Sequence, residues 1–361
     1  AITVVRGPLM RETLALQNIW LPSPAGRMAW LAEHLKNLPG SGIIYTLTIR
    51  DAERVTEWLK RNGYKVEAYH SQIDANNNED DGEKERLRRE ELEVRLLNNE
   101  VKALVSTVAL GMGFDKPDLG FVIHFQRPGS VVHYYQQVGR AGRAVDSAHG
   151  ILLSGEEDQE ITDYFIRSAF PPQAHVDKIL EALNTAENGL SVPMMQRQLN
   201  LSSGEINKCL KLLAVETPSP VAKMGSKWHA TPVEYRMDLE KIKELCALRQ
   251  AEQAEMIAYM KTKECLMVYL GRALDDQTIQ PCGKCASCVG HSIVPEEFSP
   301  DTANQAAIFL KRSYQPVEAR KRWPVKDMFE HYPFKGSVIP PELMVNEGRA
   351  LSLWGDAGWG H

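Results

Sequence analysis

The chain has 361 residues, of which 43% are hydrophobic and 25% charged, and its formal net charge at pH 7 is −5. These values are ordinary for a folded protein of two or three domains and exclude a collagen-like or largely disordered chain. The negative net charge gives no global reason to expect nucleic-acid binding, which would depend on local positive charge. No apolar run approaches the roughly 20 residues that span a bilayer, and we expect neither a signal peptide nor a membrane partner.

Short apolar runs alternate with an amphipathic stretch between residues 42 and 125. Apolar residues recur at helical spacing over 50–63, and Gly63 marks the end of that helix. Short buried strands separated by helices indicate a parallel sheet covered on both faces, so the predicted fold class is α/β. Strands are predicted over 42–45, 64–70, 101–110 and 120–125.

The stretch 71–100 divides into two halves. Its first half is polar and acidic with nothing to bury in a core, so we expect a mobile loop there. Its second half places apolar residues at helical spacing, and we expect a helix that uses Leu87, Leu92, Val94 and Leu97.

The sequence QQVGRAGR at 136–143 places a glycine directly before each of two arginines. On a helix, Arg140 and Arg143 would share one face because they are three residues apart. Each glycine costs such a helix about 1 kcal/mol relative to alanine, which indicates a backbone that must lie close to a ligand. Guanidinium groups bind phosphate oxygens in a bidentate manner. We therefore interpret this segment as a phosphate-handling face.

From residue 171 onward the pattern becomes helical, with three short helices followed by a hairpin over 219–232 that turns at Gly225. Three helices and such a hairpin predict a winged helix-turn-helix, whose third helix usually enters a nucleic-acid groove. The alternative is a scaffold that packs on its neighbours and touches no DNA. The three helices are predicted over 175–186, 192–200 and 202–216, the last with a Ser-Ser-Gly-Glu capping signal.

A metal site is predicted after the charged helical stretch 238–274. Cysteines spaced by two residues suit tetrahedral zinc, and a fourth cysteine from a helix would complete a closed, structural site. The expected ligands are Cys265, Cys282, Cys285 and Cys288, and His291 is the alternative to one of them. The other two cysteines, Cys209 and Cys246, are interpreted as buried thiols. This cysteine usage favours a reducing compartment, the cytoplasm.

The last part of the chain, 296–361, is rich in proline and we expect an appendage or linker. Its basic segment could bind phosphates or could be an ordinary solvated surface. The segment contains Lys311, Arg312, Arg320, Lys321, Arg322 and Lys326 alongside Tyr314 and Trp323.

Several segments follow one another in a specific order along the chain: SGIIYTLTIRDAERV at 41–55, EAYH at 67–70, ALVSTVALGMGFDKPDLGFVIHF at 103–125 and YYQQVGRAGR at 134–143. In this order they resemble the second RecA-like lobe of superfamily two helicases. The segment TVALGMGFDKP, the arginine motif and the cysteine module resemble RecQ-like DNA helicases. The winged helix precedes the cysteines, as in a bacterial subgroup of that family.

The resemblance implies a role for each residue of the arginine motif. Arg143 matches the family's arginine finger, which places positive charge at the γ-phosphate during ATP hydrolysis. The alternative for Arg143 is a structural salt bridge. Arg140 would assist at the phosphates or hold the interface between lobes, and Gln136 or its neighbour Gln137 would be a polar positioning group.

The resemblance also implies contacts to nucleotide and nucleic acid. Gly113 would let the backbone approach the ligand closely, and Asp115 matches the acidic residue that faces the ribose. Thr107 matches a contact to the nucleic-acid backbone. Thr48 and Arg50 are similar to a second phosphate-binding turn, for which ordinary loop solvation is the alternative.

Neither a G-x4-G-K-[S/T] loop nor an Asp-Glu-x-His segment occurs in the chain. In the family both belong to a first RecA-like lobe that binds ATP and Mg²⁺. The chain begins with Ala1 rather than methionine, and we expect it to be the C-terminal part of a helicase that is inactive without that lobe.

The leading hypothesis is the C-terminal portion of an ATP-dependent 3′-to-5′ DNA helicase. Its expected partners are single-stranded DNA, tailed duplex DNA and the missing N-terminal lobe. One alternative is a non-catalytic zinc and winged-helix DNA-binding protein that retains a dead lobe, and another is an RNA helicase of DEAD-box type. The expected domains are the second RecA-like lobe over 1–168, the winged helix over 169–237, a helical zinc module over 238–295 and the appendage over 296–361.

Overall fold

The computed structural model describes residues 9–70, 81–110, 114–312, 315–317, 319–323, 336–346 and 348–350. The chain forms two compact units. The sheet unit comprises Thr13–Phe125, Arg140–Leu153 and Ser292–His361, and the helical unit comprises Ala1–Glu12, Gln126–Gly139 and Ser154–His291. Within the described ranges, no helix combines the length and the apolar character that crossing a membrane requires.

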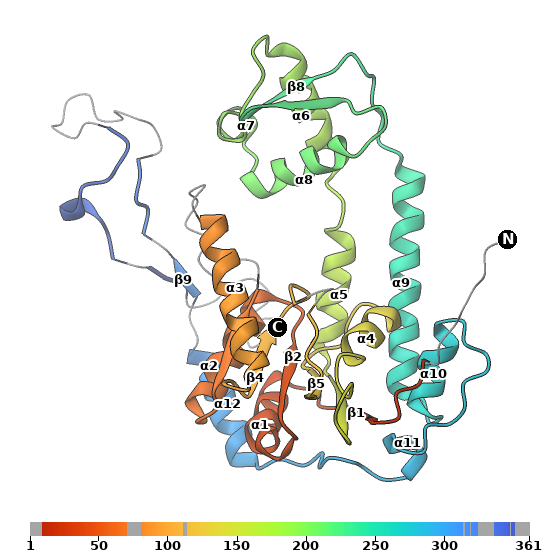
Figure 1. Ribbon diagram of the computed structural model, residues 1–361. Helices are drawn as coiled ribbons and strands as arrows, with labels where there is room; N and C mark the ends of the chain where they lie inside the picture. Colours follow the sequence, from red (N-terminus) through yellow and green to blue (C-terminus); the bar gives the residue numbers. More distant parts are fainter. Residues whose placement is uncertain are drawn as a thin grey trace. The chain divides into compact units, whose positions relative to one another are not determined.

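The sheet unit is built on six strands in the order β1-β6-β5-β2-β4-β3 (Figure 1). Strand β2 is parallel to both β4 and β5, and the pairs β3–β4 and β5–β6 are parallel as well. The predicted strands and the α/β class are therefore confirmed, whereas the flanking strands β1 and β6 were not predicted. The strands are β1 (Leu14–Trp20), β2 (Ser41–Tyr45), β3 (Val66–Tyr69), β4 (Ala103–Ser106), β5 (Leu119–His124) and β6 (Ala148–Ser154).

Three helices pack together with one face of the sheet: α1 (Pro24–His34), α2 (Ile49–Arg61) and α12 (Pro300–Arg312). A short 3-10 turn, Leu35–Asn37, extends α1. The shared core contains Trp30, Trp58 and Phe309 together with Ile44 and Ile123 of the central strands. The Trp58 and Phe309 rings lie 5.5 Å apart, so α12 is part of this core.

The expectation of an appendage over 296–361 is therefore wrong for the part up to residue 312. Its physical cause is an apolar stripe on α12, from which Ala306 and Phe309 are buried. Beyond α12 the described elements are β9 (Gln315–Val317), a 3-10 turn (Pro341–Leu343) and β10 (Gly348–Ala350), with β9 and β10 antiparallel. Of the basic segment, Lys311 and 320–322 are exposed, and Tyr314 and Lys326 lie outside the described residues.

Helix α3 (Asp81–Leu97) confirms the predicted helix but not its buried face. Leu92 is buried together with Leu96, whereas Leu87, Val94 and Leu97 are exposed. Leu92 and Leu96 are four residues apart and form the stripe that faces the sheet, where α3 contacts β3 and β4. The predicted loop that precedes this helix falls on 71–80, outside the described residues.

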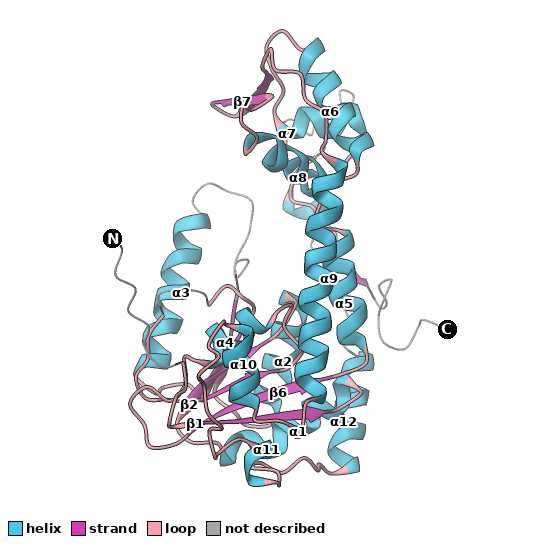
Figure 2. Ribbon diagram, turned by 90° about the vertical axis from the view of Figure 1, so that its right-hand side faces the viewer, coloured by secondary structure: helices cyan, strands magenta, loops and turns pink. Residues whose placement is uncertain are grey.

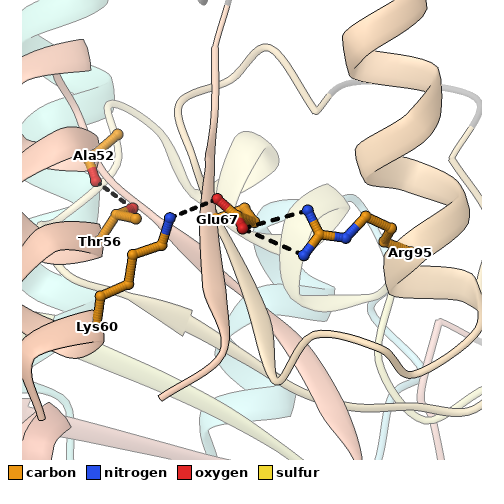
Figure 3. A network of polar contacts seen from close by, with 5 residues as sticks. All are labelled: Ala52, Thr56, Lys60, Glu67 and Arg95. Atoms are coloured by element: carbon orange, nitrogen blue, oxygen red, sulfur yellow. Dashed lines mark hydrogen bonds and ion pairs between the residues drawn. The ribbon is translucent and has the colours of Figure 1, made fainter. Parts of the chain in front are cut away.

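Glu67 joins α2 and α3 to the edge strand β3 (Figure 3). Its carboxylate accepts a hydrogen bond from Lys60 Nζ at 2.7 Å and two from the Arg95 guanidinium at 3.3 Å. Burial acts to raise the pKa of Glu67, but Lys60 and then Arg95 outweigh it, and the pKa is lowered. Charged side chains on an edge strand also disfavour pairing with a further strand.

The helical unit contains the predicted winged-helix arrangement, with α6, α7, α8 and β7 close together in Figure 2. The capping box is confirmed: Ser202 Oγ accepts from Glu205 N at 3.3 Å, and the Glu205 carboxylate accepts from Ser202 N at 2.8 Å. Gly225 has φ +62° in the two-residue turn of the hairpin, as predicted. The elements are α6 (Gln173–Thr185), α7 (Val192–Leu199), α8 (Ser203–Ala214), β7 (Val221–Met224) and β8 (Lys227–Ala230).

The remaining helices of this unit are α4 (Val131–Val138), α5 (Glu157–Arg167), α9 (Leu239–Lys261), α10 (Leu266–Ala273) and α11 (Ala286–Val289). Cys209 is buried in the core of the winged helix, as predicted. Cys246 on α9 is only half-buried, so its interpretation as a buried thiol is wrong. The first half of α9 is largely exposed, because its buried residues are confined to Gln253, Met256 and Tyr259 in the second half.

Candidate active site and metal centre

The carboxyl ends of the parallel strands bring several predicted residues to one edge of the sheet. Tyr45 at the end of β2 is in register with Ser106 of β4 and His124 of β5. Thr48 follows β2 and Thr107 follows β4 directly. In open α/β sheets this edge is where ligands bind.

Thr48 is the N-cap of α2. Its hydroxyl oxygen accepts from Asp51 N at 3.0 Å and the hydroxyl lies 2.7 Å from the Asp51 carboxylate. This cap explains why a threonine stands there, since an N-cap side chain satisfies a free amide of the first helical turn. Arg50 is half-buried in that turn. The nucleic-acid role of Thr48 and Arg50 stays a prediction.

Thr107 is half-buried, and its hydroxyl oxygen accepts a hydrogen bond from Ala109 N at 3.4 Å. Its predicted contact to a nucleic-acid backbone is not tested by this local bond. Gly113, predicted to approach a nucleotide, lies in 111–113, outside the described residues.

Arg140 is held by the loop that follows β4. Its Nη1 donates to the carbonyl oxygen of Phe114 at 2.8 Å. The hydroxyl of Tyr45 donates to the carbonyl oxygen of Leu110 at 3.2 Å, so the two side chains hold the residues on both sides of 111–113. Burial raises the pKa of Tyr45 to about 12, and the positive charge of Arg140 opposes that rise. Tyr45 therefore remains a neutral hydrogen-bond donor beside the guanidinium.

Tyr45 was not predicted as a site residue. Its ring is stacked on His124 at 5.2 Å between centroids. The available signal was its position as the last residue of the buried strand SGIIY, where a polar group reaches the carboxyl edge of the sheet.

Arg143 forms an ion pair with Asp115, with Nη1 and Oδ1 2.6 Å apart. The structure thus brings together the residues predicted as the arginine finger and the ribose-facing acid. The side chains remain 36% and 58% exposed, and exposed ion pairs contribute about 0–1 kcal/mol. A negatively charged ligand can therefore compete for Arg143 at low cost. The alternative of a structural salt bridge also fits this pair.

The arginine motif is not helical, contrary to our expectation. Helix α4 ends at Val138, so Arg140 and Arg143 lie in the turns that follow and share no helix face. Gly142 has φ +77°, and a Cβ there would lie 2.5 Å from Thr13 Oγ1. This glycine serves a tight turn against the chain before β1, rather than an approach to a ligand. Gln136 is exposed on α4 in the helical unit, and its predicted positioning role is untested.

The cysteine cluster joins two segments of the helical unit. The thiol sulfurs of Cys265, Cys282, Cys285 and Cys288 all lie within 4.8 Å of one another. Cys265 is the N-cap of α10 rather than a residue within a helix, which corrects our expectation of its local structure. His291 is exposed, and its Nδ1 lies 3.0 Å from the carbonyl oxygen of Val289.

The cluster has the dimensions of a tetrahedral thiolate site. The sulfur pairs Cys265–Cys285 and Cys282–Cys288 are 3.9 and 4.0 Å apart. Sulfurs about 2.3 Å from a central zinc would be about 3.8 Å apart at the corners of a tetrahedron. The donor set therefore fits a closed site that can hold a metal ion such as zinc.

Hydrogen bonds around the cluster favour bound thiolates. Leu266 N donates to Cys285 Sγ at 3.4 Å and Cys282 N donates to Cys265 Sγ at 3.2 Å. A hydrogen bond to Cys285, and then burial, raises the pKa of Cys282 to about 12, while the same contact lowers the pKa of Cys285. Such crowded thiols must share protons, and a divalent cation would replace those protons.

The chain is similar to known helicases. Residues 26–145 match the helicase conserved C-terminal domain. The ATP-dependent DNA helicase RecQ of Synechocystis sp. is 27% identical over 273 residues, which cover 71% of this chain and 50% of that protein. The ATP-dependent DNA helicase RecQ of Bacillus subtilis is 36% identical over 129 residues, which cover 36% of this chain and 20% of that protein. This chain thus spans half or less of the length of these relatives.

A further relative is an ATP-dependent DNA helicase Q1 of Rattus norvegicus, 41% identical over 118 residues, which cover 33% of this chain and 17% of that protein. Among solved structures, the E. coli DEAD-box protein SrmB bound to regulator of ribonuclease activity A is 22% identical over 43% of this chain and 84% of that chain, with a TM-score of 0.34. A similarity of that extent adds nothing to the assignment.

Proposed function

We propose that this chain, which is similar to RecQ helicases and matches the helicase conserved C-terminal domain, forms the second RecA-like lobe of an ATP-dependent 3′-to-5′ DNA helicase. A first lobe would bind ATP and Mg²⁺, and this chain would complete the site and grip DNA. The observation that carries the proposal is the Arg143–Asp115 pair beside the anchored Arg140.

Arg143 would act as the arginine finger. ATP hydrolysis needs positive charge where negative charge develops on the γ-phosphate. Arg143 would exchange its exposed carboxylate partner for the nucleotide, and the released Asp115 would be free to accept from the ribose. Arg140, held by Phe114, would fix the backbone that presents Arg143. Gln136 would be a polar positioning group and Gly113 the close backbone contact.

DNA would be held mainly through its phosphates. Three predicted contacts lie just beyond the carboxyl ends of β4 and β2: Thr107, Thr48 and Arg50. There they would bind phosphates along a single DNA strand. Phosphate contacts carry little sequence information and weaken as salt rises. Single-stranded DNA and tailed duplexes are the substrates that this arrangement favours.

The metal would be a structural zinc ion held by Cys265, Cys282, Cys285 and Cys288. All positions of a tetrahedral site would be filled by protein, which leaves no place for an activated water. The zinc ion would join the start of α10 to the cysteine-rich segment 282–288.

The test is ATP hydrolysis by the complete helicase in the presence of tailed DNA, with Arg143→Ala compared with Arg86→Ala. Arg86 is also exposed and pairs with Glu90 at 2.8 Å, so it is a matched control. We expect Arg143→Ala to lower kcat by about 10³-fold or more with unchanged DNA affinity. Unchanged turnover in Arg143→Ala would refute the finger assignment and leave the salt bridge as the role of Arg143, whereas no ATP hydrolysis by the unaltered protein would favour a non-catalytic DNA-binding protein.

RNA should also be compared with DNA as the activator of that ATPase. Stimulation by DNA alone agrees with the proposal, whereas stimulation by RNA alone would favour an RNA helicase of DEAD-box type.

A further inference from the structure

Three tyrosines from different helices form a row inside the helical unit. The ring centroids of Tyr134 on α4 and Tyr259 on α9 are 5.2 Å apart, and those of Tyr259 and Tyr269 on α10 are 5.4 Å apart. Tyr134 and Tyr259 are completely buried. Offset or tilted aromatic pairs at such distances are favourable beyond the area that they bury. The row therefore fixes three helices against one another (Figures 1 and 2).

Tyr259 connects the row with the cysteine cluster. Its ring packs on that of Tyr269, whose helix α10 has Cys265 as its N-cap. Tyr269 adds two bonds: its N–H donates to Cys265 O at 3.0 Å and its hydroxyl donates to Glu255 O at 3.1 Å. The packing of α9 and α10 thus depends on where Cys265 is held.

Helix α4 has few other buried side chains with which to fix its position. Its buried residues are Val131, Tyr134 and Val138, so Tyr134 is the largest group on that face. Burial raises the pKa of Tyr134, and a hydrogen bond with Tyr259 opposes that rise. Arg140 follows the end of α4 after a single glycine. A substitution at Tyr134 that disorders α4 would therefore also disorder the backbone that leads into Arg140.

We infer that Tyr259 is a positioning residue that couples the cysteine cluster to α4, so that metal occupancy sets the order of the helix that leads into the arginine motif. The coupling is carried by ring packing in this row, in which Tyr134 and Tyr259 are buried and Tyr269 is half-buried. By linkage it must also act in reverse, because a change at α4 must alter metal affinity by the same factor as the metal alters the stability of α4. The consequence for ATP turnover rests on the proposed function.

The first test exploits that reciprocity in the full chain loaded with zinc. Tyr134 is not a metal ligand, yet Tyr134→Leu should bind zinc about tenfold more weakly than the unaltered chain, as measured at equilibrium in competition with a chelator. The matched control is Tyr164→Leu on α5, because Tyr164 is 60% exposed and outside the row. Tyr134→Phe keeps the ring and should restore most of the zinc affinity. Equal zinc affinity of Tyr134→Leu and the unaltered chain would overturn the inference.

The second test needs no substitution. Amide hydrogen exchange in α4 is compared before and after chelation of zinc, with α8 of the winged helix as the internal control. Exchange in α4 should become about tenfold faster or more while exchange in α8 stays constant, since locally coupled segments open together. Unchanged exchange in α4 after complete zinc removal contradicts the coupling even if a variant fails to fold.

The catalytic consequence has its own measurement. In the complete helicase, Tyr259→Leu should lower kcat for ATP with little change in KM, and Tyr259→Phe should retain most of the turnover. An Arg143→Ala variant without effect would refute the arginine-finger role in the proposed function, whereas the zinc-affinity and exchange experiments would still decide the role of Tyr259.

Discussion

The Arg143–Asp115 pair and the cysteine cluster are held in opposite ways. Arg143 and Asp115 are joined by one ion pair between largely exposed groups, worth about 0–1 kcal/mol. Cys265 and Cys285 are buried, and structural zinc contributes about 10–16 kcal/mol of binding free energy in small zinc peptides. A site that must exchange partners when a ligand arrives benefits from weak contacts, whereas a site that supports the fold benefits from strong ones.

Removing one cysteine is expected to give the largest effect. Cys285→Ser should lower the zinc content from about one ion per chain to none, because a closed tetrahedral site needs all of its ligands. The free energy of unfolding should fall by several kcal/mol, measured by urea titration with metal analysis. Cys246→Ser is the matched control, since Cys246 is half-buried and outside the cluster. Zinc retained by Cys285→Ser would remove the four-cysteine assignment.

The turn that presents Arg143 should be the next most sensitive point. Gly142→Ala places a Cβ 2.5 Å from Thr13 Oγ1 in a backbone with φ +77°, and we expect a loss of about 1–3 kcal/mol in unfolding free energy. Gly129→Ala is the control, because no atom lies within 4 Å of the added Cβ. Equal stability of the two variants would mean that the arginine motif is not held by this turn.

The sequence predicts the cysteine cluster well but not the local structure of the arginine motif, for a physical reason. Metal-ligand spacing is local: three of the ligands lie within seven residues, and tetrahedral geometry restricts the fourth. The turn at Gly142 instead packs against Thr13, which donates a hydrogen bond to the Gly142 carbonyl oxygen from 129 residues away in the chain. Helical spacing therefore gave a wrong local structure for Arg140 and Arg143, and their roles in ATP hydrolysis stay predictions.

The fold likewise divides into features with local sequence signals and features that depend on contacts between distant segments. The central strands and the capping box of α8 were predicted because their signals lie within the segments themselves. The role of α12 in the core was not predicted. Its apolar stripe is buried only because Trp58 and other core residues from distant segments pack against it. Tyr45 was missed for a similar reason: its partners Leu110 and Arg140 come from distant segments.

The smallest expected effect is the most informative about Arg143. A double-mutant cycle of Asp115→Asn and Arg143→Gln, measured by urea unfolding of the full chain, isolates the energy of the ion pair. We expect a coupling of about 0–1 kcal/mol at low salt that fades at high salt, since exposed charges are screened. A coupling of several kcal/mol that persists at high salt would mean that Asp115 locks Arg143 in the fold. A locked arginine would have to pay that energy before reaching a nucleotide, and a structural salt bridge would then be the better account of the pair.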